Sequence, residues 1–202
     1  MRPERKPVCM TAFIIINVVV FFWLSFGGQT EDGLYMYEHG AMYVPAFLGG
    51  EKYRIFTSMF LHFGFNHLMN NMITLLIVGR RLESVVGSVK FFVIYLLSGV
   101  GGTALSACVE YLREDYAISA GASGAIFGLT GALLCLTLLN RGYIAGVTKW
   151  EMLIIIGISL YNGFVSPGVD NAAHIGGLIV GFVVAYLLCF KRYAKRRSNI
   201  NF

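Results

Sequence analysis

The sequence predicts an all-α membrane protein, a bundle of six transmembrane helices with a long interfacial outer loop between helices 1 and 2. Three observations lead to this prediction: an apolar composition, six long uncharged stretches, and an uneven distribution of Lys and Arg. Of the 202 residues, 56% are hydrophobic and 13% are charged, whereas about 25% are charged in an ordinary soluble domain. The mean hydropathy is +0.67. This apolar, aromatic-rich composition excludes a disordered chain.

The uncharged stretches set the expected spans in order along the chain. A helix that crosses a bilayer needs about 20 residues, within a range of about 17–25. The six stretches contain 24, 25, 19, 25, 18 and 20 residues, so each of them qualifies. They are Pro7–Thr30, Ile55–Gly79, Phe91–Val109, Tyr116–Asn140, Met152–Val169 and Asn171–Phe190.

The first stretch has an alternative interpretation as a cleaved signal peptide, because a basic segment precedes it. Its 24 uncharged residues exceed the usual apolar region of about 7–15 residues, and no A-x-A cleavage site follows. The outer loop then runs from about Gly27 to Arg54. Its uncharged part His39–Gly50 is too short to span, and the loop is rich in aromatic residues, as is typical of chain lying in the headgroup region.

The Lys and Arg residues orient the expected spans. Six spans put both termini on one side, and if that side is cytoplasmic, 13 Lys and Arg residues lie inside and three lie outside. The positive-inside rule favours this orientation. We therefore expect a multi-pass protein of the plasma membrane, bacterial in type, with cytoplasmic termini. Nucleic-acid binding is not expected despite the net charge of +5, because the basic residues lie between apolar blocks instead of along one face.

The chain is expected to form one membrane domain over residues 1–202. Residues 1–9 form the cytoplasmic N-terminus, about 10–190 the six-helix core, and 191–202 a basic cytoplasmic tail that anchors the topology. The cysteines form no CxxC pair, so neither a disulfide framework nor a zinc finger is indicated. They are Cys9, Cys108, Cys135 and Cys189.

Polar side chains inside expected spans are costly and therefore indicate function. The second span contains His62, His67 and Asn71, the fourth contains Ser123, and the sixth contains His174. If both stretches are helical, Ser123 lies about 12 Å beyond Asp115 and His174 about 6 Å beyond Asp170. Spans two, four and six run in the same direction, so the serine and histidine are expected to face each other in the outer half. His62 is expected at the interface, partly hydrated.

Glycines at helical spacing lie on the same two spans. Gly124 and Gly128 follow Ser123, while Gly177 and Gly181 form a GxxxG pair on the face of His174. Small residues at these spacings let helix backbones pack closely. They predict close packing of the fourth span against the sixth.

A serine next to a histidine supports nucleophilic catalysis. A neutral histidine can take the serine proton, and acyl transfer also needs donors aimed at the developing oxyanion. The candidate donors are the Asn71 amide, a ring nitrogen of His67 and the backbone N–H of Ser123. His67 and Asn71 share one helical face, and an interhelical hydrogen-bonding pair is the alternative interpretation. Asp170 is expected to mark a helix boundary, so the prediction is a dyad without a third acid.

In chain order, these residues resemble the rhomboid family of intramembrane serine proteases over roughly Glu51–Phe190. The resemblance implies a six-helix core, catalysis by Ser123 with His174, oxyanion support, and an outer loop that shapes the substrate entrance. The oxyanion support would come from His67, Asn71 and Gly121. The motifs that carry it are Tyr53-Arg54, His62, His67, Asn71, Gly121-Ala-Ser-Gly124, Ala173-His-Ile-Gly-Gly177 and Gly181.

Two positions differ from the usual family pattern. Tyr53 stands where the family commonly has Trp, and Phe127 stands where many members have Tyr. Phe127 can stack on His174 but has no hydroxyl to donate.

The resemblance implies an endopeptidase that cuts transmembrane segments of other membrane proteins near the outer face, and we expect no metal or cofactor. The expected partners are these substrates and the lipid bilayer, and the oligomeric state is not predicted. Because hydrocarbon holds no water, the enzyme would need a wet cavity and a locally unwound substrate. The alternatives are a catalytically inactive rhomboid-like binder of transmembrane segments, a small transporter or channel, and a haem or metal protein that uses His67 and His174.

Overall fold

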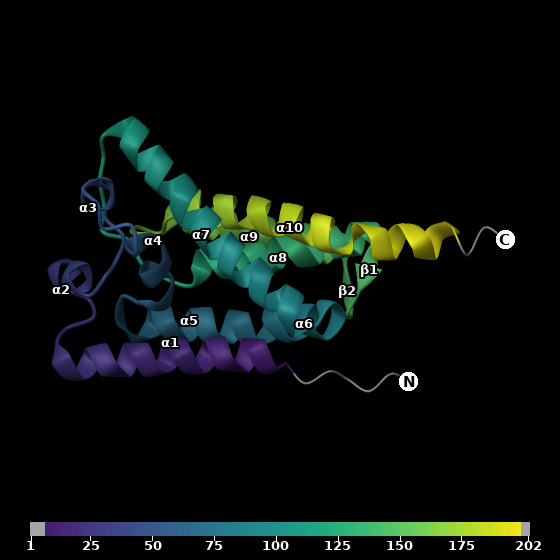
Figure 1. Ribbon diagram of the computed structural model, residues 1–202, viewed down its shortest axis with the longest axis horizontal. Coiled ribbons are helices and arrows are strands. Elements are labelled where there is room, and N and C mark those ends of the chain that lie inside the picture. Colours follow the sequence, from purple (N-terminus) through teal and green to yellow (C-terminus); the bar gives the residue numbers. More distant parts are fainter. Residues whose placement is uncertain (1–6, 199–202) are drawn as a thin grey trace.

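The computed structural model describes residues 7–198, except for the side chains of residues 192 and 194–198, and most of this chain is helical (Figure 1). The N-terminal residues 1–6 and the last residues 199–202, both in the predicted cytoplasmic segments, lie outside the described part. The elements are α1 (Val8–Gly27), α2 (Gly33–Glu38), α3 (Val44–Leu48), α4 (Arg54–Thr57), η1 (Ser58–Phe60), α5 (Gly64–Thr74), η2 (Leu75–Gly79), α6 (Arg80–Val86), α7 (Ser88–Arg113), α8 (Ser123–Leu139), β1 (Tyr143–Ile144), β2 (Val147–Thr148), α9 (Lys149–Val165) and α10 (Asn171–Ser198).

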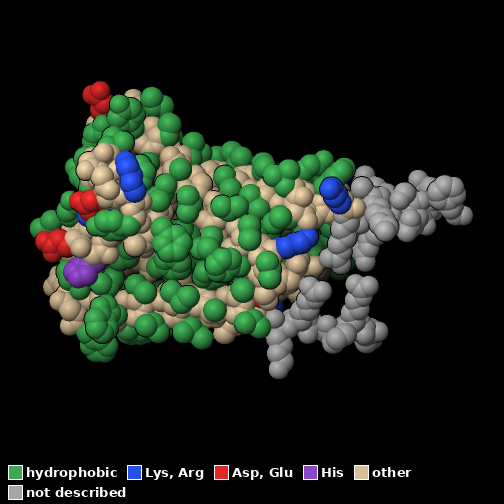
Figure 2. All heavy atoms as spheres, viewed as in Figure 1, with side chains coloured by type: hydrophobic (Ala, Val, Ile, Leu, Met, Phe, Trp, Pro, Cys, Tyr) green, Lys and Arg blue, Asp and Glu red, His purple; other side chains and the backbone are tan. Residues whose placement is uncertain are grey.

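Within residues 7–198, three helices are long and apolar enough to cross a membrane. They are α1, α7 and the Asn171–Lys191 part of α10, with mean hydropathies of 2.4, 1.8 and 2.2. Helix α8 is also apolar but has 17 residues. In Figure 2 hydrophobic side chains cover the middle of the visible face, and charged side chains gather towards its two ends. These features indicate an integral membrane protein.

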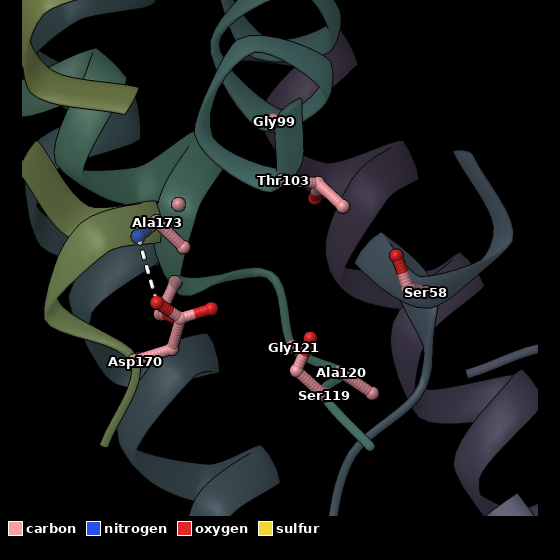
Figure 3. Close-up of a pocket in the computed structure, with 10 residues that line it drawn as sticks. Ser58, Gly99, Thr103, Ser119, Ala120, Gly121, Asp170 and Ala173 are labelled. Carbon is pink, nitrogen blue, oxygen red and sulfur yellow. Dashed lines mark hydrogen bonds between the residues drawn. The ribbon is translucent and has the colours of Figure 1, made fainter. Parts of the chain in front are cut away.

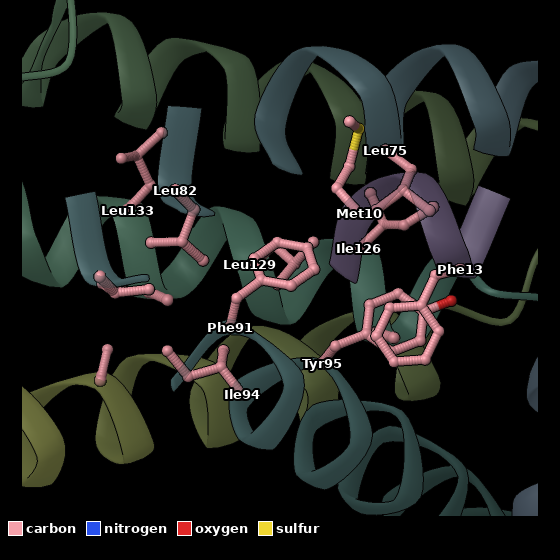
Figure 4. Close-up of a cluster of buried hydrophobic side chains, with 14 of the residues drawn as sticks. Met10, Phe13, Leu75, Leu82, Phe91, Ile94, Tyr95, Ile126, Leu129 and Leu133 are labelled. Atoms are coloured by element: carbon pink, nitrogen blue, oxygen red, sulfur yellow. The ribbon is translucent and has the colours of Figure 1, made fainter. Parts of the chain in front are cut away.

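Helix α8 lies at the centre of the bundle and packs against α7 and α10. Its residues Leu129 and Leu133 are buried against Phe91 and Ile94 of α7 (Figure 4). Helix α1 joins the same core, where the ring of Phe13 stacks on that of Tyr95 with centroids 3.9 Å apart. The core is therefore formed by helices from both ends of the chain.

A buried carboxylate ties three helices together at the end of the bundle opposite α2 and α3. Glu83 of α6 is 1% exposed. It accepts hydrogen bonds from the backbone N–H groups of Cys9 and Met10 at 2.9 and 2.7 Å, and from Ser88 Oγ at 2.6 Å. Glu83 thereby supplies the side-chain acceptors for the first turn of α1 that its N-cap residue, Pro7, lacks.

The segment between α1 and α5 folds around one arginine. Arg54 is 3% exposed, donates to the carbonyl oxygens of Tyr37 and Ala41 at 2.6 and 2.7 Å, and pairs with Glu51 at 2.6 Å. Hydrogen bonds from Tyr53 and Arg54 hold the pKa of Glu51 below its ordinary value. Two backbone carbonyl groups and one carboxylate thus satisfy the buried guanidinium and join α2 to the start of α4.

Two of the predicted spans were wrong in where their helices begin. The stretch from Ile55 forms the short helices α4 and η1, and the long helix starts only at Gly64, after which α5, η2 and α6 follow without a gap. The stretch from Tyr116 stays non-helical until Ser123, with Ser119 and Met42 exchanging backbone hydrogen bonds of 2.8 and 2.9 Å. A lack of charge marks a segment that can enter a bilayer, but it does not separate helix from extended chain.

Two further differences concern the other end of the bundle. The all-α prediction omitted a small antiparallel hairpin, β1 with β2, in which Tyr143 lies opposite Thr148. Helix α10 also continues to Ser198, well into the predicted basic tail.

Candidate functional site

Ser123 and His174 meet between α8 and α10. His174 Nε2 and Ser123 Oγ lie 2.9 Å apart, which is hydrogen-bond distance. Ser123 is the first residue of α8, and His174 lies in the first turn of α10 with 8% of its surface exposed. The predicted juxtaposition of the two side chains is confirmed, although the helical-rise estimate for Ser123 was wrong because residues 116–122 are not helical.

Glycines bring the two helices close enough for this contact. A Cβ on Gly177 would collide with the carbonyl oxygen of Gly124, and a Cβ on Gly181 would collide with that of Gly128. Both contacts are with backbone atoms, which cannot move aside as a flexible side chain can. The predicted close packing of the fourth and sixth spans is present, in a register that places His174 beside Ser123.

The imidazole of His174 is held on one face by an aromatic ring. The Phe127 ring, one turn after Ser123, stacks on His174 with centroids 4.2 Å apart and an interplanar angle of 11°. The predicted stacking is confirmed. Among the described residues, His174 Nδ1 has no hydrogen-bond partner.

Asp170 closes the N-terminus of α10. Its Oδ1 accepts the backbone N–H of Ala173 at 2.8 Å, and its Oδ2 accepts the hydroxyl of Ser106 at 2.5 Å. A carboxylate in this position satisfies a free amide at the start of the helix. The predicted role of Asp170 as a helix boundary is confirmed.

His67 of α5 lies against the loop that leads into α8, and Asn71 follows one turn later on the same helix. A Cβ on Gly121 would lie 2.9 Å from the His67 ring, and Gly121 itself has φ of +145°, which favours glycine. Asn71 is buried, and its amide nitrogen donates to the His67 carbonyl oxygen at 3.2 Å. The pair is thus joined within one helix, and an oxyanion role for either residue remains a prediction.

His62 was wrongly expected at a hydrated interface. It is 0% exposed, because it lies in the loop before α5 and turns inward. Its Nε2 accepts the backbone N–H of Ala122 at 3.5 Å, and its ring meets that of His67 edge-on with centroids 5.2 Å apart. His62 therefore supports the residue immediately before Ser123, a role that the sequence motif alone did not indicate.

A small cavity lies beside Ser123 (Figure 3). The volume of the cavity is about 30 Å³, enough for roughly one or two water molecules. Ser58 Oγ, in the cavity wall, is buried with no hydrogen-bond partner among the described residues. Sequence reasoning missed Ser58 and Thr103, since hydroxyls in apolar segments usually bond to their own helix. The lining residues are Ser58, Gly99, Thr103, Ser119, Ala120, Gly121, Ser123, Gly124, Asp170 and Ala173.

Metal ligands are not gathered at this site. Over residues 7–198, no group of three or more His, Cys, Asp or Glu side chains is arranged to hold a metal ion. The four cysteines are free thiols.

Comparison with known proteins assigns the family. A family model described as the Rhomboid domain matches residues 49–191. The chain belongs to the rhomboid family. It is 38% identical over 183 residues to Rhomboid protease GluP of Bacillus subtilis (strain 168), covering 91% of this chain and 35% of that protein.

Two further relatives are similar to this chain over most of its length. RHOMBOID-like protein 4 of Arabidopsis thaliana is 41% identical over 145 residues, covering 71% of this chain and 36% of that protein. Putative rhomboid protease YdcA of Bacillus subtilis (strain 168) is 28% identical over 182 residues, covering 90% of this chain and 89% of that protein. The chain spans about a third of the length of GluP and of RHOMBOID-like protein 4.

Tyr53 and Phe127, which differ from the usual rhomboid pattern, lie in different surroundings. The Tyr53 hydroxyl donates to Glu51 Oε2 at 2.8 Å, so a tyrosine adds a bond to the Arg54 cluster. Phe127 keeps the stacking contact with His174 but has no hydroxyl to donate.

Proposed function

We propose that this rhomboid-family chain is an intramembrane serine endopeptidase that cleaves transmembrane segments of other membrane proteins near the outer face. Ser123 is the nucleophile, and His174 is the general base. The observation that supports the proposal is the 2.9 Å contact between Ser123 Oγ and His174 Nε2, the geometry that a serine needs to lose its proton as it attacks. Membership of a family with members named proteases supports the reaction class.

The reaction follows from the groups around Ser123. The hydroxyl donates its proton to His174 Nε2 as Oγ attacks the substrate carbonyl, and the imidazolium then protonates the leaving amine. Ser123 begins α8, so its amide is among the first-turn N–H groups that have no partner within the helix. That N–H, the His67 ring and the Asn71 amide stabilise the oxyanion. Asn71 gives up its bond to the His67 carbonyl when it does so.

Hydrolysis of the acyl-enzyme needs water inside an apolar bundle. The cavity lined by Ser58, Thr103 and Asp170 adjoins Ser123 and has polar groups to hold a water molecule. His174, once neutral again, takes a proton from this water as the water oxygen attacks the ester carbonyl. The bond between the acyl carbon and Ser123 Oγ then breaks, and the imidazolium returns the proton to Oγ.

The proposed membrane arrangement has six spans in one domain. They are α1, the continuous run Gly64–Val86, α7, α8, α9 and α10. The site lies at the outer end with the α2–α4 loop beside it, and the termini are cytoplasmic. The distribution of Lys and Arg supports this orientation, and the plasma membrane of a bacterium is the proposed location.

The substrate must expose a peptide bond that is shielded in a helix. Its transmembrane segment unwinds locally at the site, and weak helix formers such as Gly near the cut lower the cost of unwinding.

The test is labelling of the purified chain with a fluorophosphonate probe, together with cleavage of a transmembrane test substrate. We expect the probe on Ser123, and we expect Ser123→Ala and His174→Ala each to abolish cleavage. Ser25→Ala, which removes a hydroxyl bonded to Phe21 within α1, is the matched control and should cleave normally. Full cleavage by Ser123→Ala would exclude this mechanism, whereas an unlabelled chain that still binds transmembrane segments would indicate an inactive binder.

A further inference from the structure

One face of α7 reaches both segments that lead into the site. Ser106 and Glu110 are four residues apart and share this face. Ser106 Oγ donates to Asp170 Oδ2 at 2.5 Å, and Glu110 Oε2 accepts the backbone N–H of Ala117 at 3.4 Å. The first contact ties α7 to the start of α10, and the second ties it to the loop before Ser123.

Asp170 uses both carboxylate oxygens and its backbone carbonyl at this junction. Oδ1 accepts the N–H of Ala173, Oδ2 accepts the hydroxyl of Ser106, and the carbonyl oxygen accepts the N–H of His174 at 3.2 Å. Figure 3 shows the Asp170 carboxylate next to the Ala173 amide at the edge of the cavity. His174 therefore directly follows Ala173, whose backbone N–H is bonded to the Asp170 carboxylate.

The same turn of α10 lies directly on α7. A Cβ on Gly102 would come within 2.6 Å of the Ala173 carbonyl oxygen, and a Cβ on Gly176 within 3.1 Å of the Gly101 carbonyl oxygen. Gly102 lies one turn before Ser106 on α7. Close backbone contact followed one turn later by a short hydrogen bond leaves the first turn of α10 little freedom to tilt.

We propose that Asp170 is a positioning residue for the reaction. Bonded to Ser106, it holds the first turn of α10 so that His174 Nε2 stays within reach of Ser123 Oγ. The inference rests on the proposed serine protease function. A displacement of about 1 Å at reacting groups can cost about 10²-fold in rate, so a tether that fixes a 2.9 Å contact has a measurable effect.

The experiment compares Asp170→Ala, Asp170→Asn and Ser106→Ala in the full chain, purified in detergent. Three quantities are measured for each variant: kcat and KM on a transmembrane test substrate, the rate of fluorophosphonate labelling of Ser123, and the melting temperature. Thr148→Ala is the matched control. It removes the side-chain cap of α9, a bond from the Glu151 N–H at 3.2 Å that involves no residue of α8 or α10.

Asp170→Ala is expected to lower kcat about tenfold or more, with KM nearly unchanged and the labelling rate reduced in parallel. Asp170→Asn should recover most of the activity, because its amide oxygen can accept the Ala173 N–H as an Asp oxygen does. Its NH2 group can donate to the Ser106 hydroxyl, which is able to accept as well as donate. Ser106→Ala should lie between wild type and Asp170→Ala, since the Ala173 bond remains. Thr148→Ala should lower the melting temperature comparably but keep kcat and the labelling rate.

Wild-type kcat and labelling rate in Asp170→Ala would overturn the positioning role, as would an equal loss of kcat in Thr148→Ala. An Asp170→Asn variant as slow as Asp170→Ala would overturn the tether in favour of an effect of charge. If Asp170→Ala does not fold, Ser106→Ala carries the test, and a wild-type labelling rate in it overturns the role. If the wild-type chain is not labelled at Ser123, the proposed function fails and the positioning role falls with it.

Discussion

At the residue scale, Asn71 can serve helix packing or can donate a hydrogen bond to the oxyanion, and its surroundings fit both roles. It lies on α5 one turn after His67, is buried, and donates its amide N–H to the His67 carbonyl oxygen at 3.2 Å. The His67 carbonyl oxygen already accepts a backbone N–H within α5, so the additional bond from the Asn71 side chain adds little to the stability of the helix. An amide held in such a bond can rotate to an oxyanion when one forms, at the cost of one modest hydrogen bond.

For Asn71→Ala we expect turnover to fall about 10²–10³-fold, the usual cost of losing one oxyanion donor. The melting temperature should change little. Both quantities are measured on the same purified variant, with Asn70→Ala, the exposed neighbour on α5, as the control. Wild-type turnover with a lowered melting temperature would assign Asn71 to packing and remove it from the oxyanion site.

At the scale of elements, the contact between α8 and α10 depends on the absence of side chains. Gly177→Ala would place a methyl group against the Gly124 carbonyl oxygen, and such overpacking typically costs about 1–3 kcal/mol. We expect a lower melting temperature and a larger loss of activity than of folded protein, because α10 carries His174. A Gly177→Ala enzyme with wild-type turnover would show that the register of the two helices tolerates this shift.

Gly157 offers the matched control for that substitution. It lies within α9, and a Cβ there would meet nothing within 4 Å among the described residues. Gly157→Ala should leave turnover unchanged and stabilise the helix by about 0.5–1 kcal/mol. Thermal unfolding of both variants separates the general effect of Gly→Ala from the effect of the helix contact.

The hydrogen bonds of Glu83 lead to a second prediction at the scale of elements. Its carboxylate accepts two backbone N–H groups of α1 and the Ser88 hydroxyl of α7. Glu83→Gln would turn one acceptor into a donor that faces other donors, so we expect a loss of about 2–3 kcal/mol in unfolding free energy. Glu114→Gln changes an exposed carboxylate and should leave stability within about 0.5 kcal/mol. A Glu83→Gln protein as stable as wild type would contradict this account.

For the whole molecule, the proposed topology predicts which ends are accessible from outside. A cysteine at Leu48 of α3, which is 55% exposed, should react with an impermeant thiol reagent in intact cells. A cysteine at Lys191 should react only after lysis. The measurement requires a background without Cys9, Cys108, Cys135 and Cys189. Labelling at residue 191 in intact cells would reverse the proposed orientation.

Much of this protein could be predicted from local properties of the chain. The apolar stretches indicate a membrane protein, because the cost of placing charge in hydrocarbon depends on each residue separately. The family follows from motifs in order around Ser123 and His174, and the Rhomboid domain match covers both. The spacing of Gly124, Gly128, Gly177 and Gly181 predicted the packing faces, because helical periodicity is a property of the sequence itself.

Only the tertiary structure decided where helices begin and what supports the site. Residues 116–121 lie outside any helix, where Ser119 pairs with Met42 and the Gly121 N–H donates to the Ser58 carbonyl oxygen at 2.9 Å. These contacts join segments far apart in the chain. The burial of His62 follows from that same loop path. The bond between Asp170 and Ser106 joins residues 64 positions apart. Hydrogen bonds of this kind depend on the three-dimensional path of the backbone, which no local pattern of charge or hydropathy specifies.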